Sequence, residues 1–143
     1  MILVDSEDRI IVESHGWCID SHGYAVATIK YKKTYLHRLI MKVIDTSVYV
    51  DHINRNKLDN RKSNLRLCSH RDNLNNRPAN KNNTSGFKGL YWHKRNNKWV
   101  VRITVEGKCI SLGCYSDKIE AAKIYNAAAI KYFGEFAYLN KVE

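Results

Sequence analysis

Residues 50–67 read VDHINRNKLDNRKSNLRL and are unusually dense in side chains that ligate metals, move protons or contact phosphate. The stretch opens on Asp51 and His52 and carries Asn64 near its end. A histidine with its ordinary pKa of about 6.5 can take a proton from water at neutral pH, so His52 is a candidate general base. Hydrolysis of a phosphodiester needs such an activated water and positive charge near the phosphate oxygens. This stretch is therefore the candidate chemical centre.

A short helix is predicted directly after this stretch, with Ser69 as its N-cap and Asn73 on its surface. Consecutive strand residues point to opposite faces, so Asp51 and His52 serve one site only where their strand bends or ends against that helix. A carboxylate from Asp51 and an amide oxygen from Asn73 form a hard oxygen site. Such a site suits Mg²⁺, with Mn²⁺ as a substitute, better than Zn²⁺.

The residues before the centre favour a small antiparallel sheet followed by a helix. Alternating apolar residues predict strands at Ile10–Val12 and Tyr24–Ile29, with a tight turn at Lys32–Lys33. From Leu36 to Val43 the apolar residues change to helical spacing, which predicts a short amphipathic helix.

The second half begins after a predicted linker at residues 78–85, which hold the only proline and three asparagines without apolar periodicity. Three strands are then predicted around Phe87–Trp92, Trp99–Val105 and Cys109–Leu112, joined by turns with familiar hairpin residues.

A helix is predicted from about residue 117 to residue 133. Asp117 and Glu120 form the pattern of a capping box, and Gly134 is a natural stop. The expected domains are therefore residues 1–77 and 86–143, separated by the linker.

The charge balance favours a polyanionic partner. Lys and Arg number 24 against 14 Asp and Glu, which gives a net charge of +10. Nucleic acid is the first expectation and an anionic membrane the rival. No long apolar run or signal peptide is visible, so we expect a protein of the cytoplasm that does not enter membranes. The four cysteines lack metal-binding spacing and are expected to be reduced.

The order of strand, loop, strand and helix that carries Asp51-His52, Asn64-Leu65-Arg66 and Asn73 resembles the HNH, or ββα-metal (His-Me finger), nucleases. The phage-type HNH homing endonucleases are the most similar group, over about residues 16–77. The resemblance implies that Asp51 and Asn73 bind the metal and that His52 is the general base. It also makes Asn64 the structural asparagine of the catalytic loop. Asn73 stands where other members have a histidine ligand, which favours magnesium over zinc.

For several neighbouring side chains two interpretations of their role stay open. His70 could be a second metal ligand, although its place at the start of a helix favours contact with solvent or phosphate. Arg55, Arg61 and Arg66 could contact the DNA backbone or simply solvate the loop.

In the second half, the segments SGFKGLY (85–91), KWVVRI (98–103), LGCY (112–115), EAA (120–122), YNAAA (125–129) and LN (139–140) resemble the plant ethylene-response-factor, or APETALA-type, DNA-binding domain. The resemblance implies a three-stranded sheet in the major groove of double-stranded DNA, backed by a helix, and the major groove admits such a sheet. Tyr91, His93, Cys109 and Ser111 depart from the plant pattern, so the plant target sequence does not transfer. The side chains expected to contact DNA are Lys88, Tyr91, His93, Lys94, Arg95, Lys98, Arg102 and Lys108.

The sequence therefore predicts an α+β protein: a ββα-metal nuclease module followed by a three-stranded antiparallel sheet packed on one helix. The expected activity is that of a site-directed, metal-dependent DNA endonuclease of the homing type. The rivals are a non-catalytic DNA-binding regulator on a degenerate nuclease scaffold and a restriction or repair HNH nuclease. Whether the protein acts as a monomer or a homodimer is left open.

Overall fold

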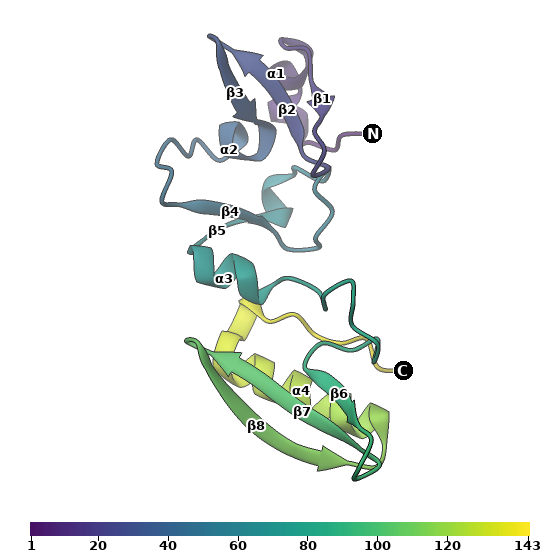
Figure 1. Ribbon diagram of the computed structural model, residues 1–143. Helices are drawn as coiled ribbons and strands as arrows, with labels where there is room; N and C mark the ends of the chain where they lie inside the picture. Colours follow the sequence, from purple (N-terminus) through teal and green to yellow (C-terminus); the bar gives the residue numbers. More distant parts are fainter. The chain divides into compact units, whose positions relative to one another are not determined.

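The computed structural model describes all 143 residues as a mixed α/β chain with two compact units, Met1–Asn73 and Leu74–Glu143 (Figure 1). No helix is long and apolar enough to cross a membrane, and all four cysteines are free thiols.

The first unit opens with two short helical segments, η1 (Ser6–Asp8) and α1 (Arg9–Glu13). The strand expected at Ile10–Val12 is wrong, because these residues lie in α1. Ile11 and Val12 pack on the core whereas Ile10 is exposed. Three consecutive apolar residues are too short a run to distinguish a strand from one side of a helix.

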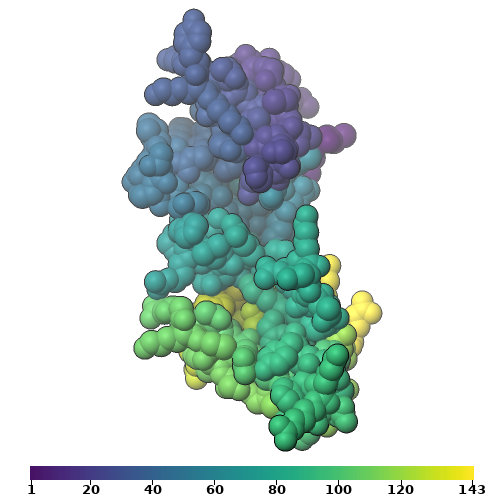
Figure 2. Space-filling model, in the orientation of Figure 1, coloured from purple at the N-terminus to yellow at the C-terminus, as the bar shows by residue number.

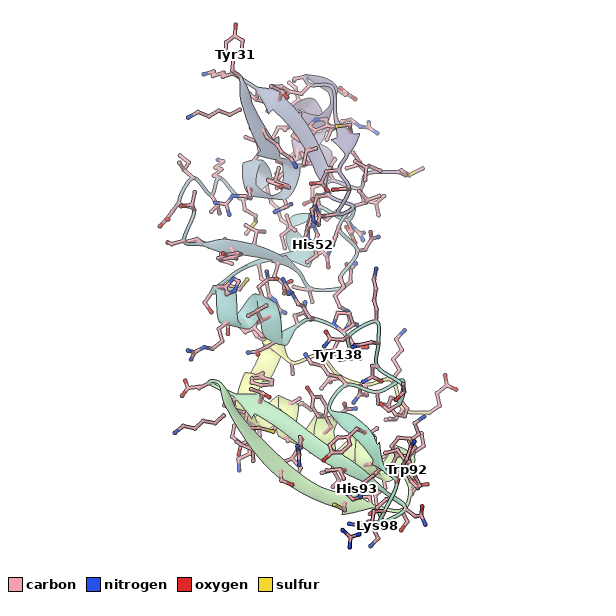
Figure 3. All side chains as sticks on the ribbon, in the orientation of Figure 1. Tyr31, His52, Trp92, His93, Lys98 and Tyr138 are labelled. Carbon is pink, nitrogen blue, oxygen red and sulfur yellow. The ribbon has the colours of Figure 1, made fainter.

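A three-stranded antiparallel sheet follows, in the order β1 (Cys18–Ile19), β2 (Ala25–Ile29) and β3 (Lys32–Tyr35). The turn between β2 and β3 lies at Lys30 and Tyr31, two residues before the predicted position. Both residues have positive φ, 48° and 65°, as a two-residue turn matched to the strand twist requires. This hairpin tip projects from the surface of the unit, with Tyr31 at its end (Figures 2 and 3).

The rest of the first unit consists of α2 (Leu36–Ile40), the antiparallel pair β4 (Tyr49–His52) and β5 (Leu65–Cys68), η2 (Lys62–Asn64) and α3 (His70–Asn75), which continues two residues beyond the unit. The predicted short helix after the sheet is confirmed in α2. The core of the unit is made by Ala25, Leu36, Ile40, Val50 and Leu65, so the first sheet, α2 and the β4–β5 pair share one apolar interior.

The predicted N-cap of α3 is confirmed. The Ser69 Oγ atom accepts a hydrogen bond from the Asp72 backbone N–H at 3.2 Å. The Asp72 carboxylate accepts a hydrogen bond in return from the Ser69 backbone N–H, also at 3.2 Å. Two of the otherwise unsatisfied donors at the helix start are thereby paired.

Residues 78–85, expected as a linker, lie within the second unit. Asn83 and Ser85 hold this segment in place: the Asn83 side chain donates to the Phe87 carbonyl at 2.9 Å, and the buried Ser85 hydroxyl donates to the same carbonyl at 2.8 Å. Side-chain hydrogen bonds fix a segment that has no apolar periodicity.

The second unit is built on an antiparallel sheet of β6 (Leu90–His93), β7 (Lys98–Val105) and β8 (Lys108–Tyr115), followed by α4 (Lys118–Phe133) and η3 (Gly134–Phe136). The three predicted strands and the predicted helix are confirmed. The Asp117 carboxylate caps α4 by accepting from the Glu120 N–H at 2.6 Å, and Gly134 ends the helix with a φ of 53°.

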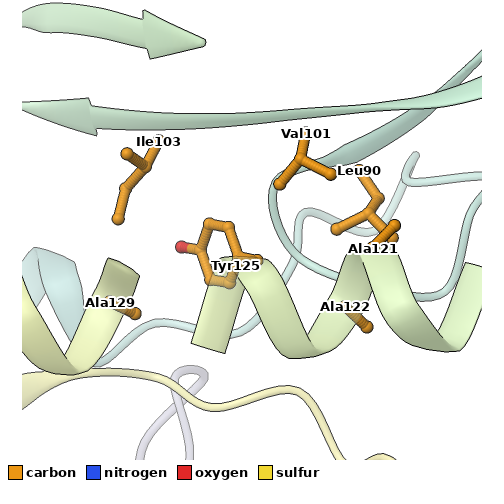
Figure 4. Packing of buried hydrophobic residues seen from close by; sticks show 7 residues of the cluster. All are labelled: Leu90, Val101, Ile103, Ala121, Ala122, Tyr125 and Ala129. Carbon is orange, nitrogen blue, oxygen red and sulfur yellow. The ribbon is translucent and has the colours of Figure 1, made fainter. Parts of the chain in front are cut away.

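The core of the second unit lies between this sheet and α4 (Figure 4). Leu90, Val101 and Ile103 come from the sheet, and α4 contributes alanines and the buried ring of Tyr125. Alanines leave little bulk between helix and sheet, so α4 packs close and the tyrosine ring fills the remaining space.

Gly89 tests this packing. Its φ is +79°, and a Cβ atom there would overlap the Tyr125 ring and lie 2.7 Å from the Arg102 carbonyl oxygen. Gly107 has the same φ, but nothing lies within 4 Å of its added Cβ. We expect Gly89→Ala to lower the free energy of unfolding by about 3 kcal/mol or more, because backbone strain and overpacking add. Gly107→Ala should cost about 1 kcal/mol, from the backbone alone.

The measurement is urea unfolding followed by tryptophan fluorescence in a Trp17→Phe background, where Trp92 and Trp99 of the second unit are the only tryptophans left. Equal losses for the two glycine variants would contradict the close packing of α4 on the sheet.

Candidate active site

His52 ends β4 and lies in the interior of the first unit (Figure 3). Its Nε2 atom is 3.2 Å from the Asn60 Oδ1 atom. Its ring stands edge-on to His37, with the ring centroids 5.1 Å apart, and its centroid is 6.0 Å from that of Tyr24. The rings of Tyr24, just before β2, and of His37, in α2, therefore flank the ring of His52.

The two buried histidines share an environment that disfavours positive charge. Burial lowers the pKa of His52, and the hydrogen bond with Asn60 opposes this shift in part. Burial also lowers the pKa of His37 to about 3, with smaller contributions from His52 and Arg38. Both rings are therefore neutral at neutral pH, which is the state in which an imidazole accepts a proton.

Asp51, next to His52 along β4, pairs with Arg66 directly across the β4–β5 ladder. Two guanidinium nitrogens of Arg66, Nη2 and Nε, lie 2.8 and 3.1 Å from the same carboxylate oxygen of Asp51. The side chains of Arg66 and Asp51 are only 11% and 9% exposed. Arg66 thus binds the Asp51 carboxylate, a contact that was not predicted from the sequence.

Asn64 fastens the loop that joins β4 and β5. Its side-chain oxygen accepts from the Asn54 backbone N–H at 2.9 Å, and its side-chain nitrogen donates to the Asp59 carbonyl at 2.8 Å. The backbone carbonyl of Asn64 also accepts from the Ile53 N–H at 2.9 Å. These are the bonds that a loop-fixing asparagine requires, and its effect on catalysis stays a prediction.

A second fastening of the same loop comes from Asp59, which is almost completely buried. Both Asp59 oxygens accept from Arg61, each at 2.7 Å, and one also accepts from the Asn54 amide at 2.9 Å. The hydrogen bonds from Arg61 hold the pKa of Asp59 at about 2. Arg61, expected at the DNA backbone, is therefore engaged with a loop carboxylate, while Arg55 lies exposed in the loop with a positive φ.

The start of the chain holds the loop from the other side. Leu3 donates its N–H to the Leu58 carbonyl and accepts at its carbonyl from the Asn60 N–H, both at 2.8 Å. The contact of Asn60 with His52 was not predicted from the sequence. The one available signal was an asparagine in a polar loop eight residues after the histidine.

Two residues that the sequence suggested for the site, Asn73 and His70, lie in α3. Asn73 is half-buried on the helix, where its backbone N–H donates to the Ser69 carbonyl at 3.1 Å. His70 is exposed, and its ring centroid is 5.1 Å from that of Tyr49.

The donor chemistry of Asp51 and Asn73, a carboxylate and a carboxamide, fits a divalent cation that prefers oxygen ligands. The structure shows no group of three or more His, Cys, Asp or Glu side chains that could hold a metal, which fits Zn²⁺ poorly. The Asp51 carboxylate faces the Arg66 guanidinium, so a metal ion bound at Asp51 would compete with this ion pair.

The residues expected to contact DNA in the second unit divide by strand alternation. The register pairs Tyr91 with Val100 and His93 with Lys98, and places Arg102 between the core residues Val101 and Ile103. The side chains on the sheet face away from α4 are therefore Tyr91, His93, Lys98 and Arg102. The guanidinium carbon of Arg102 lies 5.1 Å from the Tyr91 ring centroid, an arrangement typical of a cation–π contact.

The other expected contacts lie elsewhere. Lys94 and Arg95 lie in the turn between β6 and β7. The Lys88 ammonium donates to the carbonyls of Asn75 and Arg77 at 2.9 and 2.8 Å, so it fixes the start of the unit. Lys108 precedes the core-packed Ile110 by two residues and pairs with the core-packed Val105, which places it on the α4 side of β8.

The Arg66–Asp51 pair gives a prediction for stability. Replacing Arg66 with Met leaves a nearly buried carboxylate without its cation, and we expect a loss of about 3 kcal/mol in the free energy of unfolding. The control is Arg9→Met, because the Arg9 and Glu13 side chains of that pair are 77% and 70% exposed and the expected loss is below about 1 kcal/mol. Urea denaturation followed by circular dichroism measures both losses. Losses of similar size would show that burial of the Arg66–Asp51 pair does not increase its contribution to the free energy of unfolding.

Part of the first unit is similar to a known protein family. The HNH endonuclease family matches residues 34–75. An uncharacterised HNH endonuclease of Acanthamoeba polyphaga mimivirus is 35% identical over 138 residues, which are 93% of this chain and 71% of that protein. Protein 3.8 of Escherichia phage T7 is 43% identical over 65 residues, 46% of this chain and 54% of that protein. No solved structure matches the chain significantly. The chain belongs to the HNH endonuclease family.

Proposed function

We propose that this protein is a site-directed DNA endonuclease of the ββα-metal type, in which His52 is the general base. The observation that carries the proposal is the buried His52, whose pKa is lowered and which follows Asp51 at the end of β4. The loop that follows is held by the side-chain hydrogen bonds of Asn64. Membership of the HNH endonuclease family supports a nuclease activity on DNA.

The chain's own residues account for the proton transfer. Because burial keeps His52 neutral, its ring can accept a proton from water without first losing one. HNH nucleases generally depend on a divalent metal, and the oxygens of Asp51 and Asn73 would hold Mg²⁺, with Mn²⁺ as a substitute. The bound metal would supply positive charge to the phosphate oxygens. If the metal displaced Arg66 from Asp51, the Arg66 guanidinium would lie beside the same phosphate.

The second unit is proposed to select the DNA site through the sheet face that carries Tyr91, His93, Lys98 and Arg102, as in an ethylene-response-factor-type domain. A three-stranded antiparallel sheet backed by one helix supports this role, since a sheet of that width enters the major groove. The viral relatives support action in the cytoplasm of a host cell. The homing role is proposed from the resemblance of residues 16–77 to phage-type HNH homing endonucleases.

The first test is cleavage of supercoiled plasmid and of phage DNA with Mg²⁺ or Mn²⁺. We expect His52→Ala to lower the cleavage rate by at least about 10²-fold while DNA affinity stays unchanged, because only proton transfer is lost. His15→Ala, at a half-buried histidine outside this site, is the matched control and should cleave like the wild type.

Unchanged cleavage by His52→Ala would remove the proposed base. If the wild type bound a specific DNA sequence but cleaved no DNA with either metal, the result would support a non-catalytic DNA-binding regulator instead. The topology of the plasmid product distinguishes nicking from cutting of both strands.

The second test concerns the sheet face. We expect Arg102→Ala to weaken DNA binding and to lower the slope of log K against log [salt] by about 1, because one phosphate contact disappears. Lys123→Ala removes an equal charge from an exposed position on α4 and should leave both quantities unchanged. Fluorescence anisotropy over a salt series measures both variants, and equal effects would argue against binding through the sheet.

A further inference from the structure

We propose that Asn60 is a positioning residue for His52: its side-chain oxygen holds the proton of the neutral imidazole on Nε2 and leaves the lone pair on Nδ1 to accept the proton of water. This inference deepens the proposed function, on which it rests in taking His52 as the base. Neither the family match nor the motif assigns a role to Asn60, since the loop-fixing asparagine of that motif is Asn64.

The contact itself dictates the tautomer. A carboxamide oxygen has lone pairs and no hydrogen, so the nitrogen that faces it must be the donor. The Asn60 Oδ1 atom is 3.2 Å from the His52 Nε2 atom, and the exposed fractions of the two residues are 0% and 4%. In a neutral imidazole only one nitrogen carries a proton, so a proton held on Nε2 leaves Nδ1 as the acceptor.

Two other buried asparagines, Asn64 and Asn140, use their side chains differently. Asn64 and Asn140 each use both ends of the carboxamide on backbone groups: Asn64 links Asn54 to Asp59, and Asn140 binds the N–H and the carbonyl of Lys88. The Asn60 amide nitrogen is buried without a hydrogen-bond partner, so the contact with His52 is the one hydrogen bond of its side chain. An asparagine kept only for structure would satisfy both ends, because an unpaired buried donor costs about 1–3 kcal/mol.

The backbone around Asn60 holds the carboxamide in place. Its N–H donates to the Leu3 carbonyl at 2.8 Å, and its neighbours Asp59 and Arg61 are joined to each other by two hydrogen bonds of 2.7 Å. The amide is also neutral, so it orients the ring without adding charge to a pocket that already contains the rings of His37 and Tyr24.

The test reads the tautomer directly, by long-range ¹H–¹⁵N NMR of the imidazole nitrogens in the full chain without metal or DNA, above pH 7. A His52→Gln spectrum identifies the His52 signals among those of the six histidines. We expect the wild type to carry the proton on Nε2. Asn60→Leu should give a mixture of tautomers and a cleavage rate about 10²-fold lower, whereas Asn60→Asp, which restores an acceptor, should keep the proton on Nε2.

The control is Asn54→Ala, which removes two hydrogen bonds from the same loop but no contact with His52. It should leave the tautomer unchanged. A wild-type proton on Nδ1, which a reversed Asn60 amide would produce, overturns the proposal, and so does an unchanged tautomer in a folded Asn60→Leu variant. The wild-type spectrum alone decides the first point if that variant does not fold. Absence of cleavage by the wild type would count against the proposed function and leave the tautomer result standing.

Discussion

The arrangement of the first unit depends on how one polar loop is fastened. The residues between β4 and η2 contribute little apolar surface to the core, so side-chain hydrogen bonds have to replace packing. Asn64 ties the start of the loop to its end, and Asp59 neutralises Arg61 within it. Loop carboxylates and amides of this kind are stabilising only when fully paired, since a buried polar group left alone costs free energy. The place of His52 at the end of β4 follows from these bonds.

The elements that could be predicted from the sequence are those decided by local chemistry. Helix α4 has an aspartate cap and a glycine stop, and turn residues separate the strands of the second unit. The order of these residues along the chain is therefore enough to predict the elements. The same reasoning was wrong at Ile10–Val12, where a short apolar run has no period of its own. It was also wrong at Lys32–Lys33, where pairing of Ile29 with Lys32 moved the turn to Lys30 and Tyr31.

Residues of the candidate site could be proposed from the sequence, whereas their contacts could not. Asp51, His52 and Asn64 stand out because their residue types and order carry chemistry. The partners of Arg61 and Arg66 depend on which residues face each other in space, and a charge in a sequence does not show whether it meets solvent, phosphate or a carboxylate. The contact of Asn60 with His52 could not be predicted for the same reason, since the Asn60 backbone is bound to Leu3, far away along the chain.

That contact has a consequence for the order of folding. The strands of the second-unit sheet pair through short hairpins, although Lys88 and Asn140 of that unit also bind each other across 52 residues. The loop between β4 and β5, by contrast, is held by residues near the start of the chain. The Lys62 backbone N–H donates to the Asp5 carboxylate across a separation of 57 residues. Contacts between distant residues form slowly, because a long loop of chain must close first. The sheet of the second unit should therefore form before the loop between β4 and β5, and with it the candidate site, is fixed.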